Sequence, residues 1–364
     1  MHIKVNRQNF LTAVRIVEKS IKDNKIKPIL SCVYAKVKDN KVYFTGTNLD
    51  TTIKTSIDVN EVIREGEVAF SPSIIDEYLK EIKDEFVVLR VENGNILFIE
   101  TEDSTTEYDV FTTEDYPSTF EYINLNENNF KFEMPSQELV EIFEKVLFSA
   151  DTPDNIAMNC IRIESNNKTL NFVSTNTYRL TYLKKDVENE INDFAVSVPA
   201  DTISSIVKIV KGLDNELIKI YKEGAHLYFK YKETTIITKL IELRFPNYAD
   251  ILSNITYDKK LSINNETFTN LLKRVLIFSR SNMESKYSST YQFKHGDNGE
   301  SKLIISALND IARINEELNI SFEGEDLKIS LNSKYLLEFI QNIPKEKELV
   351  LEFMYSNSAV KVYE

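Results

Sequence analysis

The sequence is poor in the residues that build disulfide frameworks, phosphate-binding loops and metal sites. It has two cysteines, eight glycines and three histidines among 364 residues, and it has no tryptophan. Cys32 and Cys160 stand far apart and outside any Cys-x-x-Cys pair, which excludes a disulfide scaffold and indicates a reducing compartment. No Gly-rich phosphate loop, His-Glu-x-x-His or Gly-x-Ser-x-Gly motif occurs. We therefore expect no catalytic residue, no cofactor and no metal.

Long apolar runs are also missing from the chain. No stretch approaches the roughly 18 residues of a transmembrane helix, and residues 1–7 lack the apolar segment of a signal peptide. We expect a cytoplasmic protein without membrane contacts. Acidic residues outnumber basic ones by 57 to 44, for a formal charge of −13. This excess argues against a uniformly basic, nucleic-acid-coating protein, although it leaves room for a local basic surface.

What the sequence does contain is one pattern of elements written three times, with a period of about 125–130 residues. Each copy opens with a short strand and an amphipathic helix, continues with alternating strands, and then has a second helix. The predicted helices span 9–21, 71–82, 136–148, 199–211, 265–278 and 332–343. The fold class is α+β, with two helices packed on antiparallel sheet in each of three domains, at 1–125, 126–252 and 253–364.

The third copy ends differently from the first two. After the second helix, copies one and two continue with three strands, whereas copy three has two, at 349–355 and 359–363. By the internal repeat alone, we expect the third domain to be one strand short. Such a loss would leave the edge of a sheet unpaired.

Basic residues recur on the predicted helices and in the loops after the first helix of each copy. They are Arg15, Lys22, Lys25, Lys27, Lys80, Lys145, Lys208, Lys273 and Arg274. If equivalent helices face one way, these side chains form a basic face that contacts phosphates without reading bases. The alternative is that they are ordinary polar-face residues, interleaved with acidic ones such as Glu18 and Glu144.

Short motifs, in a fixed order, carry a resemblance that covers nearly the whole chain. They are Lys27-Pro28-Ile29-Leu30, Phe44-Thr45-Gly46-Thr47-Asn48-Leu49-Asp50, Asp115-Tyr116-Pro117, Ser174-Thr175-Asn176-Thr177-Tyr178-Arg179-Leu180, Arg244-Phe245-Pro246-Asn247-Tyr248 and Asn332-Ser333-Lys334-Tyr335. Each is weak alone, but the ordered set resembles the bacterial DNA polymerase III beta subunit family, the sliding clamps.

The resemblance implies a scaffold rather than an enzyme. Members of the family are homodimers in which two three-domain protomers form a six-domain ring around duplex DNA, without sequence specificity. The ring tethers the replicative polymerase and so confers processivity. Short Gln-x-x-Leu-Phe-like peptides of polymerases, the clamp loader and repair proteins dock in an apolar pocket between domains two and three. A nucleoid-associated cytoplasmic location is implied.

The resemblance also assigns roles to residues. The positions matching the peptide pocket are Met158, Thr175, Thr177, Tyr178, Arg179, Leu180, Pro246, Ile251, Asn332 and Tyr335. The implied dimer contact pairs Thr106 and Tyr108 of domain one with Ile277 and Phe278 of domain three. The nine basic residues named above are the DNA-facing candidates, with Lys22, Lys25 and Lys27 in a loop that approaches DNA in the family.

Three departures from the family pattern bear on the pocket. Within it, Tyr178 stands where a His or similar residue often stands. Asp250 replaces a commonly basic residue beside it, and the family's final strand, which forms one wall of the pocket, has no counterpart in the sequence. Two other functions therefore stay open: a protein-only peptide-binding scaffold of the same fold, and an enzyme with an acidic cleft between domains.

Overall fold

The computed structural model describes residues 1–117, 125–213, 215–281, 285–296 and 300–364, and within these ranges the chain forms two compact units. The first unit spans Met1–Phe245 and holds the first two repeats, and the second spans Pro246–Glu364 and holds the third. Each unit has a hydrophobic core of its own.

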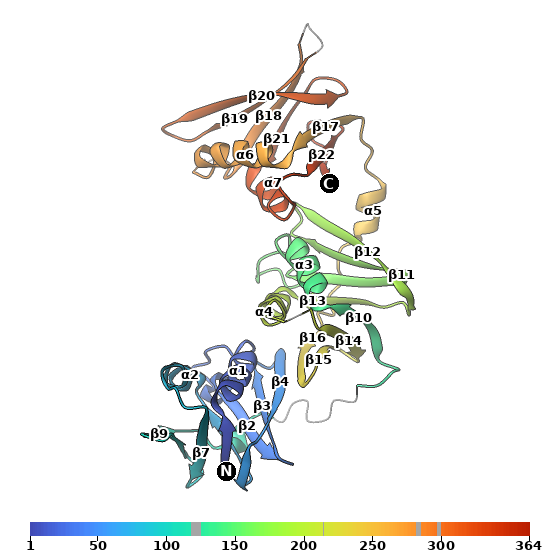
Figure 1. The fold of residues 1–364 in the computed structure, drawn as a ribbon. Coiled ribbons are helices and arrows are strands. Elements are labelled where there is room, and N and C mark those ends of the chain that lie inside the picture. The colour runs from blue at the N-terminus through green and yellow to red at the C-terminus, as the bar shows by residue number, and fades with distance from the viewer. Residues whose placement is uncertain (118–124, 214, 282–284, 297–299) are drawn as a thin grey trace. The chain divides into compact units, whose positions relative to one another are not determined.

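The three repeats have the element order that the sequence predicts (Figure 1). The first repeat contains β1 (His2–Asn6), α1 (Arg7–Glu18), a 3-10 turn η1 (Pro28–Ser31), β2 (Val33–Lys38), β3 (Lys41–Thr47), β4 (Thr51–Asp58), β5 (Glu61–Arg64), β6 (Gly66–Phe70), α2 (Pro72–Glu81), β7 (Phe86–Glu92), β8 (Ile96–Glu100), β9 (Thr105–Asp109) and η2 (Thr113–Asp115). The second contains β10 (Phe130–Pro135), α3 (Ser136–Leu147), β11 (Cys160–Thr175), β12 (Leu180–Ile191), β13 (Ala195–Pro199), α4 (Ala200–Val210), β14 (Leu217–Glu223), β15 (His226–Tyr231) and β16 (Thr234–Lys239). The third contains α5 (Tyr248–Ser253), β17 (Lys259–Asn264), α6 (Asn265–Ser279), β18 (Ser288–His295), β19 (Ser301–Leu308), β20 (Arg313–Glu323), β21 (Leu327–Asn332), α7 (Ser333–Ile340), β22 (Glu348–Phe353) and β23 (Lys361–Tyr363).

The six predicted helices are present within a few residues of their expected bounds, and side-chain caps explain where several begin. Asn6 Oδ1 accepts hydrogen bonds from the backbone N–H groups of Gln8 and Asn9 at the start of α1. Asn264 caps α6 and Asn332 caps α7 in the same way. Each cap satisfies backbone donors that have no partner inside the helix. The short helix α5 is an element that the sequence pattern does not predict.

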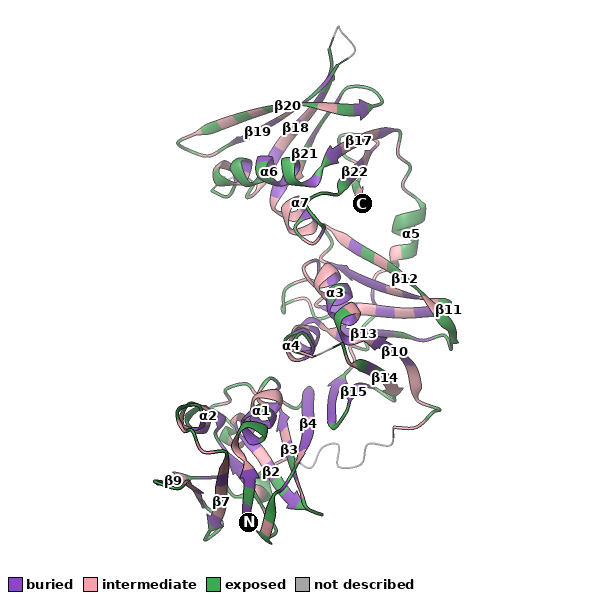
Figure 2. Ribbon diagram, in the orientation of Figure 1, coloured by how far each residue is buried: buried purple, intermediate pink, exposed green. Residues whose placement is uncertain are grey.

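One apolar stripe of each first helix packs on the sheets (Figure 2). In α1, Phe10, Val14 and Val17 are buried, and residues at the equivalent helix positions are buried in α3 and α6. Burying one such side chain contributes about 1.5–3 kcal/mol. The polar residues of these helices consequently share the opposite face, as the three- and four-residue spacings predict.

The first two repeats are joined by a single sheet. It has eight strands in the order β10-β14-β15-β16-β4-β3-β2-β6, so the last strand of the second repeat pairs with a strand of the first repeat. The pairing of β16 with β4 is antiparallel and includes Ile236 opposite Ile53 and Ile237 opposite Thr52. Both isoleucines of the first pair are fully buried. The two repeats therefore share a continuous backbone ladder.

The third repeat forms a seven-stranded sheet of its own, in the order β21-β18-β19-β20-β17-β22-β23. Its strand β22 corresponds to β7 and β14, and β23 corresponds to β8 and β15. Within the described residues, this repeat has the two-strand ending that the sequence predicts. None of the described helices is both long enough and apolar enough to cross a bilayer.

Candidate functional site

Three hairpin turns of the same design lie between β3 and β4, β11 and β12, and β19 and β20. We call them the first turn (47–51), the middle turn (175–179) and the last turn (308–312). In each, an Asn side chain accepts from the backbone N–H groups two and three residues further on, at 2.8–3.2 Å. These residues are Asn48, Asn176 and Asn309, and the N–H of each donates to the carbonyl three residues on. Such Asx turns fix the hairpin geometry locally.

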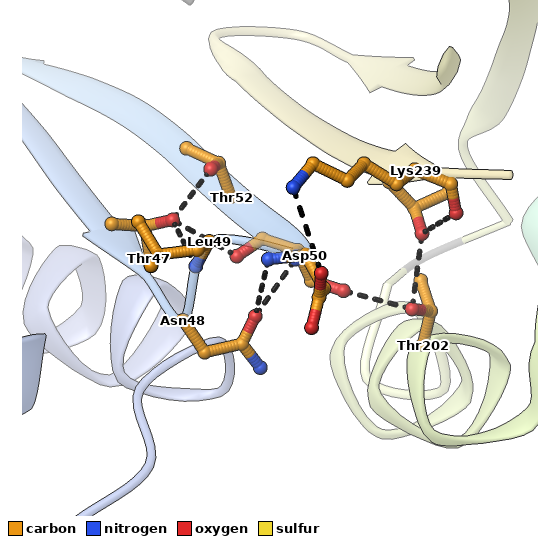
Figure 3. Close-up of polar contacts among 9 residues, drawn as sticks. Thr47, Asn48, Leu49, Asp50, Thr52, Thr202 and Lys239 are labelled. Atoms are coloured by element: carbon orange, nitrogen blue, oxygen red, sulfur yellow. Dashed lines mark hydrogen bonds and ion pairs between the residues drawn. The ribbon is translucent and has the colours of Figure 1, made fainter. Parts of the chain in front are cut away.

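The first turn docks on the second repeat, as Figure 3 shows. The carbonyl of Asp50 accepts from the N–H of Lys239 at 2.9 Å, and its carboxylate lies 3.6 Å from Lys239 Nζ. The hydroxyls of Thr51 and Thr202 share a hydrogen bond of 2.8 Å, and Thr202 also contacts Thr238 at 3.1 Å. We call this contact surface, formed by the first turn, β4, β16 and the start of α4, the first seam.

Further polar pairs lie beside the buried isoleucines of the first seam. Thr55 and Thr234 share a hydrogen bond of 2.8 Å across it, and Ser56 donates to Glu233 at 3.1 Å. The hydrogen bond from Ser56, followed by the charge of Lys41, lowers the pKa of Glu233. Because all these hydroxyls have partners, the polar lining carries no desolvation penalty from unsatisfied groups.

The middle turn holds four of the ten predicted pocket residues, namely Thr175, Thr177, Tyr178 and Arg179. Tyr178 at its tip is 83% exposed. The hydroxyl of Thr175 donates to the carbonyl of Arg179 at 2.7 Å, and Thr177 has a left-handed backbone with φ of 71°. The Arg179 guanidinium donates to the carbonyl of Phe148 and lies 5.1 Å from the centre of its ring. Arg179 therefore ties this turn to the end of α3.

The remaining members of the predicted pocket are divided between the units. Leu180 begins β12, and Met158 lies half-buried in the loop before β11. Pro246 and Ile251 lie before and within α5 of the second unit, and Ile251 is 45% exposed. Asn332 and Tyr335 lie at the cap and first turn of α7. Each unit thus holds its own part of the predicted set.

The predicted basic face is partly neutralised by carboxylates. Arg15 and Lys80 both pair with Asp76 of α2, and Lys22 Nζ lies 2.8 Å from Asp201. Desolvation of the half-buried Asp76 is outweighed by these two cations, so its pKa lies below the usual value. A further pair joins Arg274 to Glu316, with atoms 2.6 Å apart.

Other members of the basic set are exposed and are described without an ion pair. These residues are Lys25, Lys27, Lys208 and Lys273, whereas Lys145 is half-buried in the last turn of α3. Lys25 and Lys27 lie in the loop between α1 and η1. The surface available to phosphates is therefore narrower than the set of nine basic residues suggests.

The four predicted dimer residues lie on two elements, one in each unit. Thr106 and Tyr108 are half-buried on β9, which is the edge strand of the sheet β5-β1-β7-β8-β9. Ile277, which is 55% exposed, and Phe278 lie near the end of α6. An edge strand with free backbone groups invites another strand.

Sequence reasoning missed the residues that join the first two repeats, namely Asp50, Thr202 and Lys239. The signal was present in the repetition of an Asn at each hairpin turn, since Asn48, Asn176 and Asn309 are equivalent. Only the backbone pairing, however, shows which face of the turn meets a neighbour.

Two kinds of reactive side chain bear on catalysis, namely metal-ligand clusters and thiols. Among the residues that the structure describes, no group of three His, Cys, Asp or Glu side chains is arranged to hold a metal ion. Burial raises the pKa of both Cys32 and Cys160 to about 11, so neither is a thiolate near neutral pH.

Comparison with solved structures defines the class of fold. A putative DNA polymerase III beta subunit from Eubacterium rectale superposes with a TM-score of 0.91 at 22% identity, covering all of this chain and 95% of that chain. The DNA polymerase III subunit beta from Pseudomonas aeruginosa gives a TM-score of 0.89 at 22% identity, covering all of this chain and 96% of that chain. The fold is that of a three-domain sliding clamp.

Family models then identify the chain more closely. Those for the N-terminal, central and C-terminal domains of the DNA polymerase III beta subunit match residues 1–120, 133–247 and 255–364. The chain belongs to the DNA polymerase III beta subunit family, which confirms the resemblance seen in the motifs.

Two curated relatives agree with this assignment. The beta sliding clamp of Halalkalibacterium halodurans is 22% identical over 358 residues, which are 95% of this chain and 91% of that protein. The beta sliding clamp of Pseudomonas aeruginosa is 23% identical over 368 residues, which cover 100% of this chain and 96% of that protein. The chain is accordingly a processivity factor in DNA replication rather than a catalyst.

Proposed function

We propose that two copies of this chain close into a six-domain ring around duplex DNA and hold the replicative polymerase on its template. The observation that carries the proposal is the first seam, in which β16 of one repeat continues the sheet of its neighbour through β4. The same junction, repeated between copies, generates a closed assembly in which the edge of β9 finds a partner strand. The four predicted residues Thr106, Tyr108, Ile277 and Phe278 belong to that second junction.

The ring contacts DNA through phosphates and without base readout. We assign this contact first to Lys25, Lys27, Lys208 and Lys273, because these are exposed and described without a carboxylate partner. Arg15, Lys22, Lys80 and Arg274 contribute less, since each is already held by an acidic residue. Few phosphate contacts and a net charge of −13 suit a ring that binds DNA weakly and slides along it.

Partner proteins dock a short peptide at the middle turn and at α5 and α7. Leu180, Met158, Pro246 and Ile251 supply apolar surface for a Leu-Phe plug, and Met adapts to varied partners. Tyr178 is exposed and available to a peptide. The partners we propose are DNA polymerase III, other polymerases, the clamp loader and repair proteins, in the cytoplasm at the nucleoid.

Retention on DNA tests the ring directly. We expect protein loaded with a clamp loader onto nicked circular DNA to stay bound in gel filtration at about 0.2 M salt, where phosphate contacts alone are weak, and to be lost when the DNA is linearised. Reversal of Lys25 and Lys27 to Glu should reduce loading more than reversal of Lys22. Protein that dimerises and binds a Gln-x-x-Leu-Phe peptide but never stays on circular DNA would contradict the ring and favour the protein-only scaffold.

The pocket is tested separately with a fluorescent Gln-x-x-Leu-Phe peptide. We expect Leu180→Asp to weaken binding by tenfold or more, because it places a charge where the apolar plug must lie. Leu308→Asp is the matched control, since Leu308 is also a partly exposed leucine beside an Asx turn but belongs to the last turn. Equal binding by the Leu180 variant and the unmodified protein would exclude this surface.

A further inference from the structure

The first seam serves as a template for the contact between two copies, because the same positions can be traced in the other repeats. Asn48 and Asn309 align the first and last turns, and the ladders place Thr47 opposite Thr52 and Leu308 opposite Arg313. Residue 52 of β4 therefore corresponds to residue 313 of β20. Within the described residues, β17 meets the other side of β20 only at its end, from Ser321 onward, so the preceding stretch has one open edge.

The partner strand can be traced in the same way. Asn6 and Pro135 are equivalent because each directly precedes the first helix of its repeat. The ladders from β1 to β9 and from β10 to β16 then align Thr105 with Thr235. Residue 237 of β16 therefore corresponds to residue 107 of β9. Like β20, β9 is paired on one side within the described residues.

We infer that Glu107 of one copy and Arg313 of a second copy make the junction of the proposed ring specific, facing one another where β9 meets β20 in the register of the first seam. The inference rests on the proposed ring and identifies the recognition element within it. Transferring the pairing of Ile237 with Thr52 places Glu107 directly against Arg313. Both residues are exposed and are described without an ion pair.

The alternation of side chains supports this register. Along β9, Thr106 and Tyr108 are half-buried and Glu107 is exposed, and along β20 Ile314 is half-buried and Arg313 is exposed. The transferred register sets Thr106 against Ile314 on the inner face and the charged pair on the outer face. A slip of one residue would set Glu107 against the apolar Ile314 instead.

Contacts beside this charged pair are apolar at the junction between copies, although the equivalent contacts of the first seam are polar. The hydroxyl contact between Thr51 and Thr202 becomes a contact between Ala312 and Ile74, and Ile74 is 64% exposed in the single chain. Ile277 occupies the helix position of Lys19, whose carbonyl accepts from Ser205 of α4. An isolated Ile on α2 and another at the end of α6 thus gain a partner at one junction.

A charge-swap experiment tests the register. We expect Glu107→Arg and Arg313→Glu, made singly, to weaken dimerisation, because each sets like charges opposite one another at both junctions of the ring. A tenfold loss at each junction amounts to about a hundredfold for the ring. Mixing the two variants should restore the dimer as a heterodimer, since the introduced arginine then faces the introduced glutamate at one junction and Glu107 faces Arg313 at the other. Native mass spectrometry resolves these species.

Matched controls lie at the opposite edges of the same sheets. Glu61→Arg on β5 and Lys328→Glu on β21 make comparable charge changes at exposed strand positions and should leave the dimer unchanged. Circular dichroism should show all four variants folded. Variants that dimerise like the unmodified chain, or a mixture that fails to form heterodimers, would overturn the register. A strictly monomeric unmodified chain would instead overturn the ring itself.

Discussion

The first seam and the proposed junction between copies share a backbone plan but differ in side chains. The first seam joins β16 to β4 with buried hydroxyls, such as the pair Thr51 and Thr202. On the open edges of β9 and β20, the positions equivalent to Ile237 and Thr52 carry the exposed charges Glu107 and Arg313. The first two repeats belong to one chain and meet once, when the chain folds. Their seam therefore tolerates buried hydroxyl pairs. Edges that must stay in water until a second copy arrives need side chains that water also accepts.

The first seam therefore contributes mainly to stability, whereas the equivalent junction between copies contributes mainly to recognition. Opposite charges add little free energy at an exposed contact, about 0–1 kcal/mol, but like charges placed opposite one another exclude wrong partners. The hydroxyl pairs of the first seam contribute to the folding of Met1–Phe245. A substitution in the first seam should consequently affect folding, and a substitution at the equivalent position of the junction between copies should affect assembly.

The largest difference is expected for two isoleucines at equivalent positions, Ile53 in β4 and Ile314 in β20. Ile53 is fully buried opposite Ile236, whereas Ile314 is half-buried on the open edge. Ile53→Asp should lower the free energy of unfolding of the first unit by more than about 4 kcal/mol, because it buries an unpaired charge. Ile314→Asp should leave the second unit folded while abolishing the dimer. Urea denaturation and sedimentation velocity measure the two effects, and equal losses of stability would contradict the comparison.

The Asx turns give a smaller and graded difference. Asn48→Ala removes an acceptor for two backbone N–H groups, which costs about 1–2 kcal/mol, and it also loosens Asp50 at the first seam. Asn309→Ala removes the same two hydrogen bonds from the last turn. We expect the first variant to be less stable than the second in urea. A larger loss from the Asn309 variant would show that docking of the first turn adds nothing.

A hydroxyl pair within the first seam provides a finer test. Thr51→Val removes one partner of Thr202, which keeps its contact with Thr238. The expected loss is therefore only about 1 kcal/mol. A double-mutant cycle with Thr202→Val should show a coupling energy above about 0.5 kcal/mol, and additive losses would mean that the pair does not interact.

The order of elements could be predicted from the sequence because each helix and strand carries its own periodic signal. In α3, Leu139, Ile142, Phe143 and Val146 recur at the three- and four-residue spacings of an amphipathic helix, and all four residues are buried. Asn6, Asn264 and Asn332 cap their helices by accepting from backbone N–H groups two or three residues further on. These are local effects, so nearby residues specify them.

Contacts between repeats could not be predicted, because they depend on which strands meet. Nothing near Thr51 in the chain identifies Thr202, which lies 151 residues away. The same holds for the basic set, where the pairing of Arg15 in α1 with Asp76 in α2 depends on how the two helices pack. The pocket residues were assigned by resemblance, and that assignment stays a prediction.

The smallest effect is a pH dependence at the first seam. The hydrogen bond from Ser56, followed by the charge of Lys41, holds the pKa of Glu233 below its ordinary value near 4.5. A carboxyl whose pKa is lowered on folding stabilises the fold above its unfolded pKa, and this stabilisation is lost as pH falls through the folded pKa. The first unit should therefore weaken slightly between about pH 5 and pH 3, and Glu233→Gln should flatten that dependence.

Glu316 on β20 is a second carboxyl group whose pKa is lowered, and it lies in the third repeat. A hydrogen bond from Arg274 lowers its pKa in the same direction, but the pair ties α6 to β20 within the third repeat. Glu316→Gln should therefore flatten the acid dependence of the second unit and leave the first unit unchanged. The melting temperature of each variant at pH 3, 4, 5 and 7 measures both effects, because each unit has its own core. An acid dependence that Glu233→Gln leaves intact would show that the first seam owes nothing to this charge.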